Sequence, residues 1–190
     1  HIKGPLQFSG AVVGTMPKNT KTPELPDYAR DLSGDIKIAL VDGAIPELGT
    51  LEGLLTLLNP TTALNAQKGG LGYDYLGGDL KIVKGVVHTE NLELRSSQLN
   101  MNVVGKANLV EDSVLAQVKA MPLQMLDKTI KAIPLLGQIL GGGKKGGILE
   151  IYVKVSGKLS DPSYIPLPHK SLTEKPGQIL EGLFNNLQKK

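Results

Sequence analysis

Three histidines, His1, His88 and His169, are the side chains of this sequence best suited to bind a metal or move a proton. Neither His88 nor His169 has a histidine or an acidic residue four positions further on, the spacing that aims two ligands from one helix face at a metal. The chain has no cysteine, which excludes thiolate nucleophiles, disulfides and cysteine-ligated zinc. We therefore predict no metal site and no bound cofactor.

A glycine-rich segment at 141–147 formally matches the dinucleotide-binding pattern G-x-G-x-x-G. That motif needs a strand before it and a helix after it, so that the phosphate meets the helix N-terminus. Here the predicted order is helix, loop, strand, and we interpret the segment as a mobile connection. No G-x-S-x-G nucleophile elbow is present, and five Tyr, two Phe and no Trp are few rings for a sugar-binding groove. We predict that the chain is not an enzyme.

Length and composition indicate an ordinary globular domain. The chain has 190 residues, of which 41% are hydrophobic and 21% charged. A net charge of +3 is mild, and the lysines are spread along the chain, which argues against a nucleic-acid partner. No apolar run reaches the roughly eighteen residues that a membrane-spanning helix needs. Because the chain begins at His1 without an initiator Met, we expect an excised fragment of a longer protein.

Alternation of apolar and polar residues predicts strands along most of the chain. The alternation, punctuated by turn signals at Gly85 and at Glu111 and Asp112, predicts an antiparallel meander with strands near 6–13, 34–45, 79–82, 86–89, 92–94, 99–109, 114–118 and 149–155. The segments at 17–31 and 162–168 are rich in proline and are predicted to be loops.

Three segments have leucine or isoleucine at helical spacing. This spacing predicts a helix at 46–58, a helix that begins at Pro122, and a C-terminal helix at 171–190 with a capping box at its start. The predicted fold is therefore α+β: a curved, mainly antiparallel sheet built as a meander of hairpins, with about three amphipathic helices on one face or at the end.

One five-residue sequence motif occurs twice. Residues 34–38 read Gly-Asp-Ile-Lys-Ile, residues 78–82 read Gly-Asp-Leu-Lys-Ile, and 105–109 is a looser copy. Each of the first two copies is followed by a glycine turn, which indicates stacked hairpins in one long sheet. We expect a single module over 1–190, with a strand and loop entry at 1–33, a core at 34–168 and the C-terminal helix at 171–190.

Residues 69–168 resemble the C-terminal region of the AsmA-like family of bacterial cell-envelope proteins. The resemblance rests on short sequence motifs at 78–82, 85–87, 91–94, 99–105 and 133–137. Its most specific part is 153–162, where a predicted strand is followed by Gly-x-Leu-x-Asp-Pro. The resemblance implies a periplasmic protein, anchored in the inner membrane by an N-terminal helix, whose long taco-like β-groove carries phospholipid toward the outer membrane. We expect this fragment to lie outside the anchor and most of that groove, and to be its terminal module.

The partners implied are a phospholipid or another acyl-chain lipid, the rest of the parent protein's β-groove and an envelope protein. The alternating sheet is expected to present one apolar face on which hydrocarbon chains can lie. The candidate lipid-contact residues on that face are Leu80, Ile82, Leu92, Leu94, Leu99, Met101, Val103, Val114, Val118, Ile151 and Val153.

The same pattern also builds the core of any α+β domain, because helices can cover the apolar face of a sheet completely. In that case the module would be a non-transporting envelope scaffold, or a protein-interaction module involved in outer-membrane assembly. The C-terminal helix at 171–190 is expected to pack on the sheet, with a membrane surface or a partner protein as its other destinations.

Overall fold

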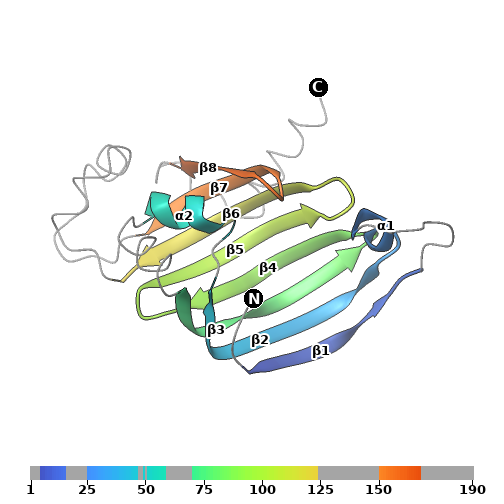
Figure 1. Cartoon of the computed structure of the whole chain (residues 1–190), viewed down its shortest axis with the longest axis horizontal. Helices are drawn as coiled ribbons and strands as arrows, with labels where there is room; N and C mark the ends of the chain where they lie inside the picture. The colour runs from blue at the N-terminus through green and yellow to red at the C-terminus, as the bar shows by residue number, and fades with distance from the viewer. Residues whose placement is uncertain are drawn as a thin grey trace.

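The computed structural model describes residues 5–15, 25–46, 49, 51–58, 70–123 and 150–167. These residues form one eight-stranded sheet in which the strands lie side by side in sequence order (Figure 1). Every neighbouring pair is antiparallel, which confirms the predicted meander. The strands are β1 (Leu6–Val13), β2 (Ser33–Ile45), β3 (Leu71–Val83), β4 (Val86–Arg95), β5 (Leu99–Asn108), β6 (Ser113–Pro122), β7 (Ile151–Lys158) and β8 (Pro162–Leu167).

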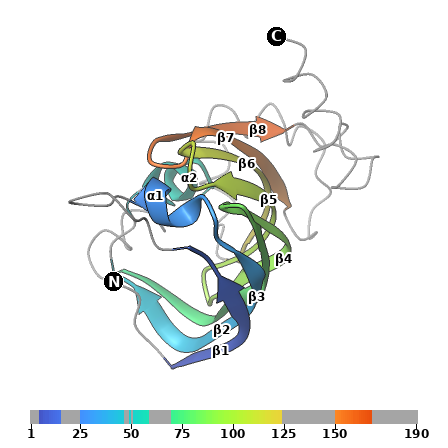
Figure 2. The same cartoon turned by 90° about the vertical axis from the view of Figure 1, so that its right-hand side faces the viewer.

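The sheet is strongly curved, as predicted. Figure 2 shows it bending from β1 to β8, with both helices on its concave side. Between β3 and β4 the chain turns through Lys84 and Gly85, which both have positive φ, 48° and 76°. Two positive φ values between the paired residues Val83 and Val86 make the tight hairpin turn whose twist matches that of the strands.

The predicted number of about three helices is not borne out in the described residues, which contain two. One is α2 (Leu51–Leu58), which begins later than the expected start at Pro46 because that proline lies in a bend directly after β2. The other is α1 (Leu25–Ala29), in the segment predicted to be an irregular loop. Pro26 lies in the first turn of α1, where the missing N–H of a proline costs no helical hydrogen bond.

The other two predicted helices fall mainly on residues outside the described part of the chain. Pro122, expected to open the second of them, is instead the last residue of β6 and is paired with Leu99. The glycine-rich segment at 141–147 and the C-terminal helix at 171–190 lie wholly outside the described residues.

Strand β8 corrects a second expectation, because 162–168 was predicted to be a proline-rich loop. Residues Pro162 to Leu167 pair with β7 from Gly157 to Tyr152. Among the described strands β8 has β7 as its only neighbour, and an edge strand tolerates proline since its outer N–H groups are not needed for pairing.

The sequence Gly-x-Leu-x-Asp-Pro at 157–162 covers the end of β7, the turn at 159–161 and the first residue of β8. Ser160 there donates two hydrogen bonds to the carboxylate of Asp112 in the turn before β6, from its backbone N at 3.0 Å and from its Oγ at 2.5 Å. The backbone N–H of Leu159 also donates to the carbonyl oxygen of Asp112. These bonds tie two turns that lie far apart in sequence at one end of the sheet.

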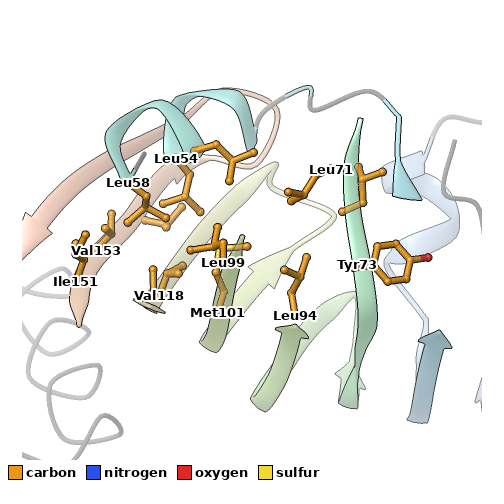
Figure 3. Packing of buried hydrophobic residues seen from close by; sticks show 14 of the residues in the cluster. Leu54, Leu58, Leu71, Tyr73, Leu94, Leu99, Met101, Val118, Ile151 and Val153 are labelled. Carbon is orange, nitrogen blue, oxygen red and sulfur yellow. The ribbon is translucent and has the colours of Figure 1, made fainter. Parts of the chain in front are cut away.

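The hydrophobic core lies between α2 and the concave side of the sheet (Figure 3). Leu54, Leu55 and Leu58 of α2 are buried against side chains from several strands, which include Leu99, Met101, Val118, Ile151 and Val153. The helix therefore covers one part of the sheet rather than its whole width.

Candidate functional site

The strand registers place an apolar side chain at almost every point of the concave side of the sheet. Directly opposed residues of an antiparallel pair point to the same face, so a chain of opposed residues traces a row across the sheet. One row runs from β1 to β7 through Leu6, Leu40, Leu76, Leu94, Met101, Ala120 and Ile151. Another runs from β1 to β8 through Val12, Gly34, Ile82, Val87, Ala107, Val114, Gly157 and Pro162.

Between these rows lie further apolar residues on the same side of the sheet, among them Phe8, Ile36, Ile38, Leu80, Leu92, Val103, Val118 and Val153. We call the surface formed by these residues and the two rows the inner face. None of its residues carries a charge. A hydrocarbon surface of this kind attracts apolar groups by excluding water and supplies no acid, base or nucleophile.

The opposite, outer face is polar. Lys119 Nζ lies 2.6 Å from Glu150 Oε1, and Tyr152 donates a hydrogen bond of 3.0 Å to the other oxygen of the same carboxylate. The hydrogen bond with Glu150 raises the pKa of Lys119 above its usual value, which keeps this lysine charged. The sheet is therefore amphipathic across its thickness.

The two copies of the repeated sequence motif lie side by side. Residues 34–38 of β2 pair with 78–82 of β3, so that Ile36 opposes Leu80 on the inner face. On the outer face Asp35 opposes Lys81, and Lys37 opposes Asp79. The repeat thus builds two neighbouring strands that are apolar on one side and charge-matched on the other.

Strand β4 carries a bulge. Between Thr89 and Leu92, which are paired with Gly105 and Val103, β4 has two residues where β5 has only Val104. One of the two, Asn91, accepts a hydrogen bond from the backbone N of Asp79 at 2.8 Å and donates one to the carboxylate of Asp79 at 2.7 Å. The hydrogen bond from Asn91 and then the contact with Lys37 lower the pKa of Asp79 below its usual value.

All eleven predicted lipid-contact residues lie on the inner face, but most of them are not accessible. Leu94, Leu99, Met101, Val118, Ile151 and Val153 belong to the core beneath α2. Ile82 is also buried, outside that core. The four that remain half-buried are Leu80, Leu92, Val103 and Val114.

The accessible part of the inner face lies toward β1, and sequence reasoning missed most of it. Leu6, Phe8 and Val12 of β1 are 61%, 58% and 39% exposed, whereas Val118 and Val153 beneath α2 are 3% and 0% exposed. Ile36 and Ile38 of β2 are half-buried. The signal was present, because 6–13 and 34–45 have the same alternation as the strands that supplied the candidates.

A hollow of about 830 Å³ lies along β1 to β4. Most of its lining residues lie on the outer, polar face and include Lys37, Asp79, His88 and Asn91, and the inner-face residues Ile36 and Leu80 also border it. The structure thus places His88 in this exposed setting, and His1 and His169 lie outside the described residues.

Among the described ranges, no group of three or more histidine, aspartate or glutamate side chains is arranged to hold a metal ion. Neither α1 nor α2 is long and apolar enough to cross a membrane, and these are the helices that the described residues contain. Comparisons of the chain with protein-family models, with curated proteins and with solved structures gave no match.

Proposed function

We propose that this chain is a lipid-binding β-groove module, in which the acyl chains of a phospholipid lie on the inner face near β1 to β4. The observation that carries the proposal is the continuous uncharged face, which is packed beneath α2 at one end and exposed at Leu6, Phe8 and Val12 at the other. Each methylene that such a surface removes from water is worth about 0.8 kcal/mol. Aliphatic side chains with few rings suit a mobile hydrocarbon chain better than a rigid ligand.

Together with the resemblance of 69–168 to the AsmA-like family, this surface supports a role in phospholipid transport between the inner and outer membranes. The module would be the end of a longer groove in a periplasmic protein that is anchored in the inner membrane. The binding step needs no catalytic residue or cofactor, because burial of the acyl chain supplies the free energy.

The test is native mass spectrometry and organic extraction of the protein purified from bacterial cells. We expect co-purified phospholipid in the wild-type protein and at least a several-fold lower load in Leu80→Asn, whose half-buried side chain lies on the inner face. Val83→Asn is the matched control, since Val83 is an exposed residue of the same strand on the outer face and its replacement should leave the load unchanged.

A wild-type protein free of lipid, or an equal loss in both variants, would contradict the proposal. Lipid-free protein that instead captures one specific envelope protein on crosslinking would favour the scaffold function. Circular dichroism of both variants must first show that the sheet is intact.

A further inference from the structure

The two edges of the sheet are protected very differently. An edge strand exposes unpaired N–H and C=O groups, and proteins usually block such an edge with proline or charge. Strand β8 has prolines at positions 162 and 166, which remove two donors from that edge. Strand β1, Leu6–Val13, contains neither proline nor a charged residue, and every one of its residues is exposed.

The composition of β1 favours pairing with an identical strand. Two copies related by a two-fold axis perpendicular to the sheet keep their inner faces on the same side. Residues that oppose each other must then both have even numbers or both have odd numbers. The two-fold axis therefore passes between one residue of β1 and the same residue of the second copy. Because β1 has no charged side chain, no like charges are brought together in this arrangement.

Only one centre gives every inner-face residue of β1 a partner. With Ser9 on the axis, Leu6 opposes Val12 of the second copy and Phe8 opposes Gly10 of the second copy. The glycine leaves room for the ring of Phe8. A centre at Gly10 would leave Leu6 unpaired and set two glycines against each other, and a centre at Phe8 would leave Val12 unpaired.

We propose that two copies of this chain associate through β1, antiparallel and centred on Ser9, and form one sheet with a continuous inner face. Hydrogen bonds between the strands would satisfy the exposed edge, and contact between the copies would cover part of the apolar surface of Leu6, Phe8 and Val12. This inference does not depend on lipid binding. A strand of a longer parent protein would compete with the second copy for the same edge.

The first test is the mass of the protein in solution, measured by light scattering over a range of concentrations. We expect twice the mass of the chain for the wild type. The Ser9→Lys variant sets two like charges face to face on the outer face at the axis and should raise the dissociation constant at least about tenfold. Ser163→Lys is the matched control, an exposed serine on the outer face of the other edge strand, and should leave the dimer intact.

The second test uses the absence of cysteine from the chain. Mild oxidation of Ser9→Cys should give a disulfide-linked dimer, since residues opposed across an antiparallel pair lie within disulfide range. Ser163→Cys should remain mostly without a disulfide crosslink, because Ser163 lies on the other edge strand and away from the axis. A wild type that is monomeric at all concentrations, or equal crosslinking of the two cysteine variants, would overturn the proposal. A monomeric wild type would favour pairing of β1 with a strand of the longer parent protein.

Discussion

Lys37 Nζ lies 3.2 Å from Asp79 Oδ1, and these two residues come from the two copies of the repeated sequence motif, at 34–38 and 78–82. The pairing is antiparallel, so the lysine of the first copy meets the aspartate of the second, and Asp35 lies at the position opposite Lys81. A shift of one residue would bring the charged residues to the inner face. The repeat therefore encodes the register of β2 with β3 by charge as well as by hydrophobicity.

Because Asp79 has two partners and Lys37 has one, removing the aspartate should destabilise the protein more. Asp79→Ala loses the ion pair and the hydrogen bond that Asn91 donates, whereas Lys37→Ala loses the ion pair alone. Both groups are largely exposed, so both effects should be small. Urea unfolding at low salt measures the order, and a larger loss in Lys37→Ala would contradict this account.

The packing of α2 on the sheet should contribute strongly to stability. Leu58 is 0% exposed and lies in the core, so Leu58→Ala should lower the free energy of unfolding by about 2–5 kcal/mol. Thr56→Ala, an exposed position of the same helix, should change it by less than about 0.5 kcal/mol. Chemical denaturation of both variants checks the difference, and similar values would mean that α2 is not packed as described.

The turn between β3 and β4 should require glycine at position 85. Its φ of 76° disfavours any side chain, and an added Cβ would lie 2.5 Å from the carbonyl oxygen of Ala29. Gly85→Ala should therefore cost about 1–3 kcal/mol. Gly72→Ala is the control, because an added Cβ at Gly72 meets nothing within 4 Å. Thermal unfolding compares the two, and equal melting temperatures would contradict the tight turn.

Acid should weaken the contact between Asp112 and Ser160. The hydrogen bonds from Ser160 hold the pKa of Asp112 below its usual value, so the folded state binds this proton more weakly than the unfolded chain. The stabilisation is then complete above the ordinary aspartate value of about 4 and is lost as the pH falls through the lower folded value.

The Asp112→Asn variant should accordingly be less stable than the wild type near neutral pH, and the gap should close toward about pH 3. Urea midpoints over this pH range measure the gap. Ser160→Ala should reduce the pH-dependent part in the same way, because it removes the hydroxyl donor. A gap that does not change with pH would show that the hydrogen bonds contribute no linkage.

The meander was predictable because its signal is local. Alternation along 34–45 and 99–109 and the glycine at position 85 determine strands and a turn without reference to distant residues. Strand β8 and α1 were missed for one reason, since proline was taken as a breaker in both. Pro162 and Pro166 are tolerated at an edge and Pro26 in a first helical turn, and neither context is visible before the chain is folded.

The inner face was predictable as a pattern but not in its accessibility. Leu99 and Leu80 alternate in the same way with polar neighbours, yet one is fully buried and the other half-buried. The difference comes from where α2 lies, which depends on packing between elements far apart in sequence. Period-two alternation identifies the face of a sheet, and only tertiary contacts divide that face into core and open surface.

The extra residue in β4 has a consequence for how the chain can vary in length. Val87 and Leu94 point the same way although one has an odd and the other an even number, because the bulge at Glu90 and Asn91 resets the alternation between them. A shorter version lacking one of these two residues would restore uniform pairing with both neighbouring strands and leave every side chain on its present side. Loss of a single residue from the middle of a strand without a bulge would instead move the side chains of half of that strand to the opposite face of the sheet.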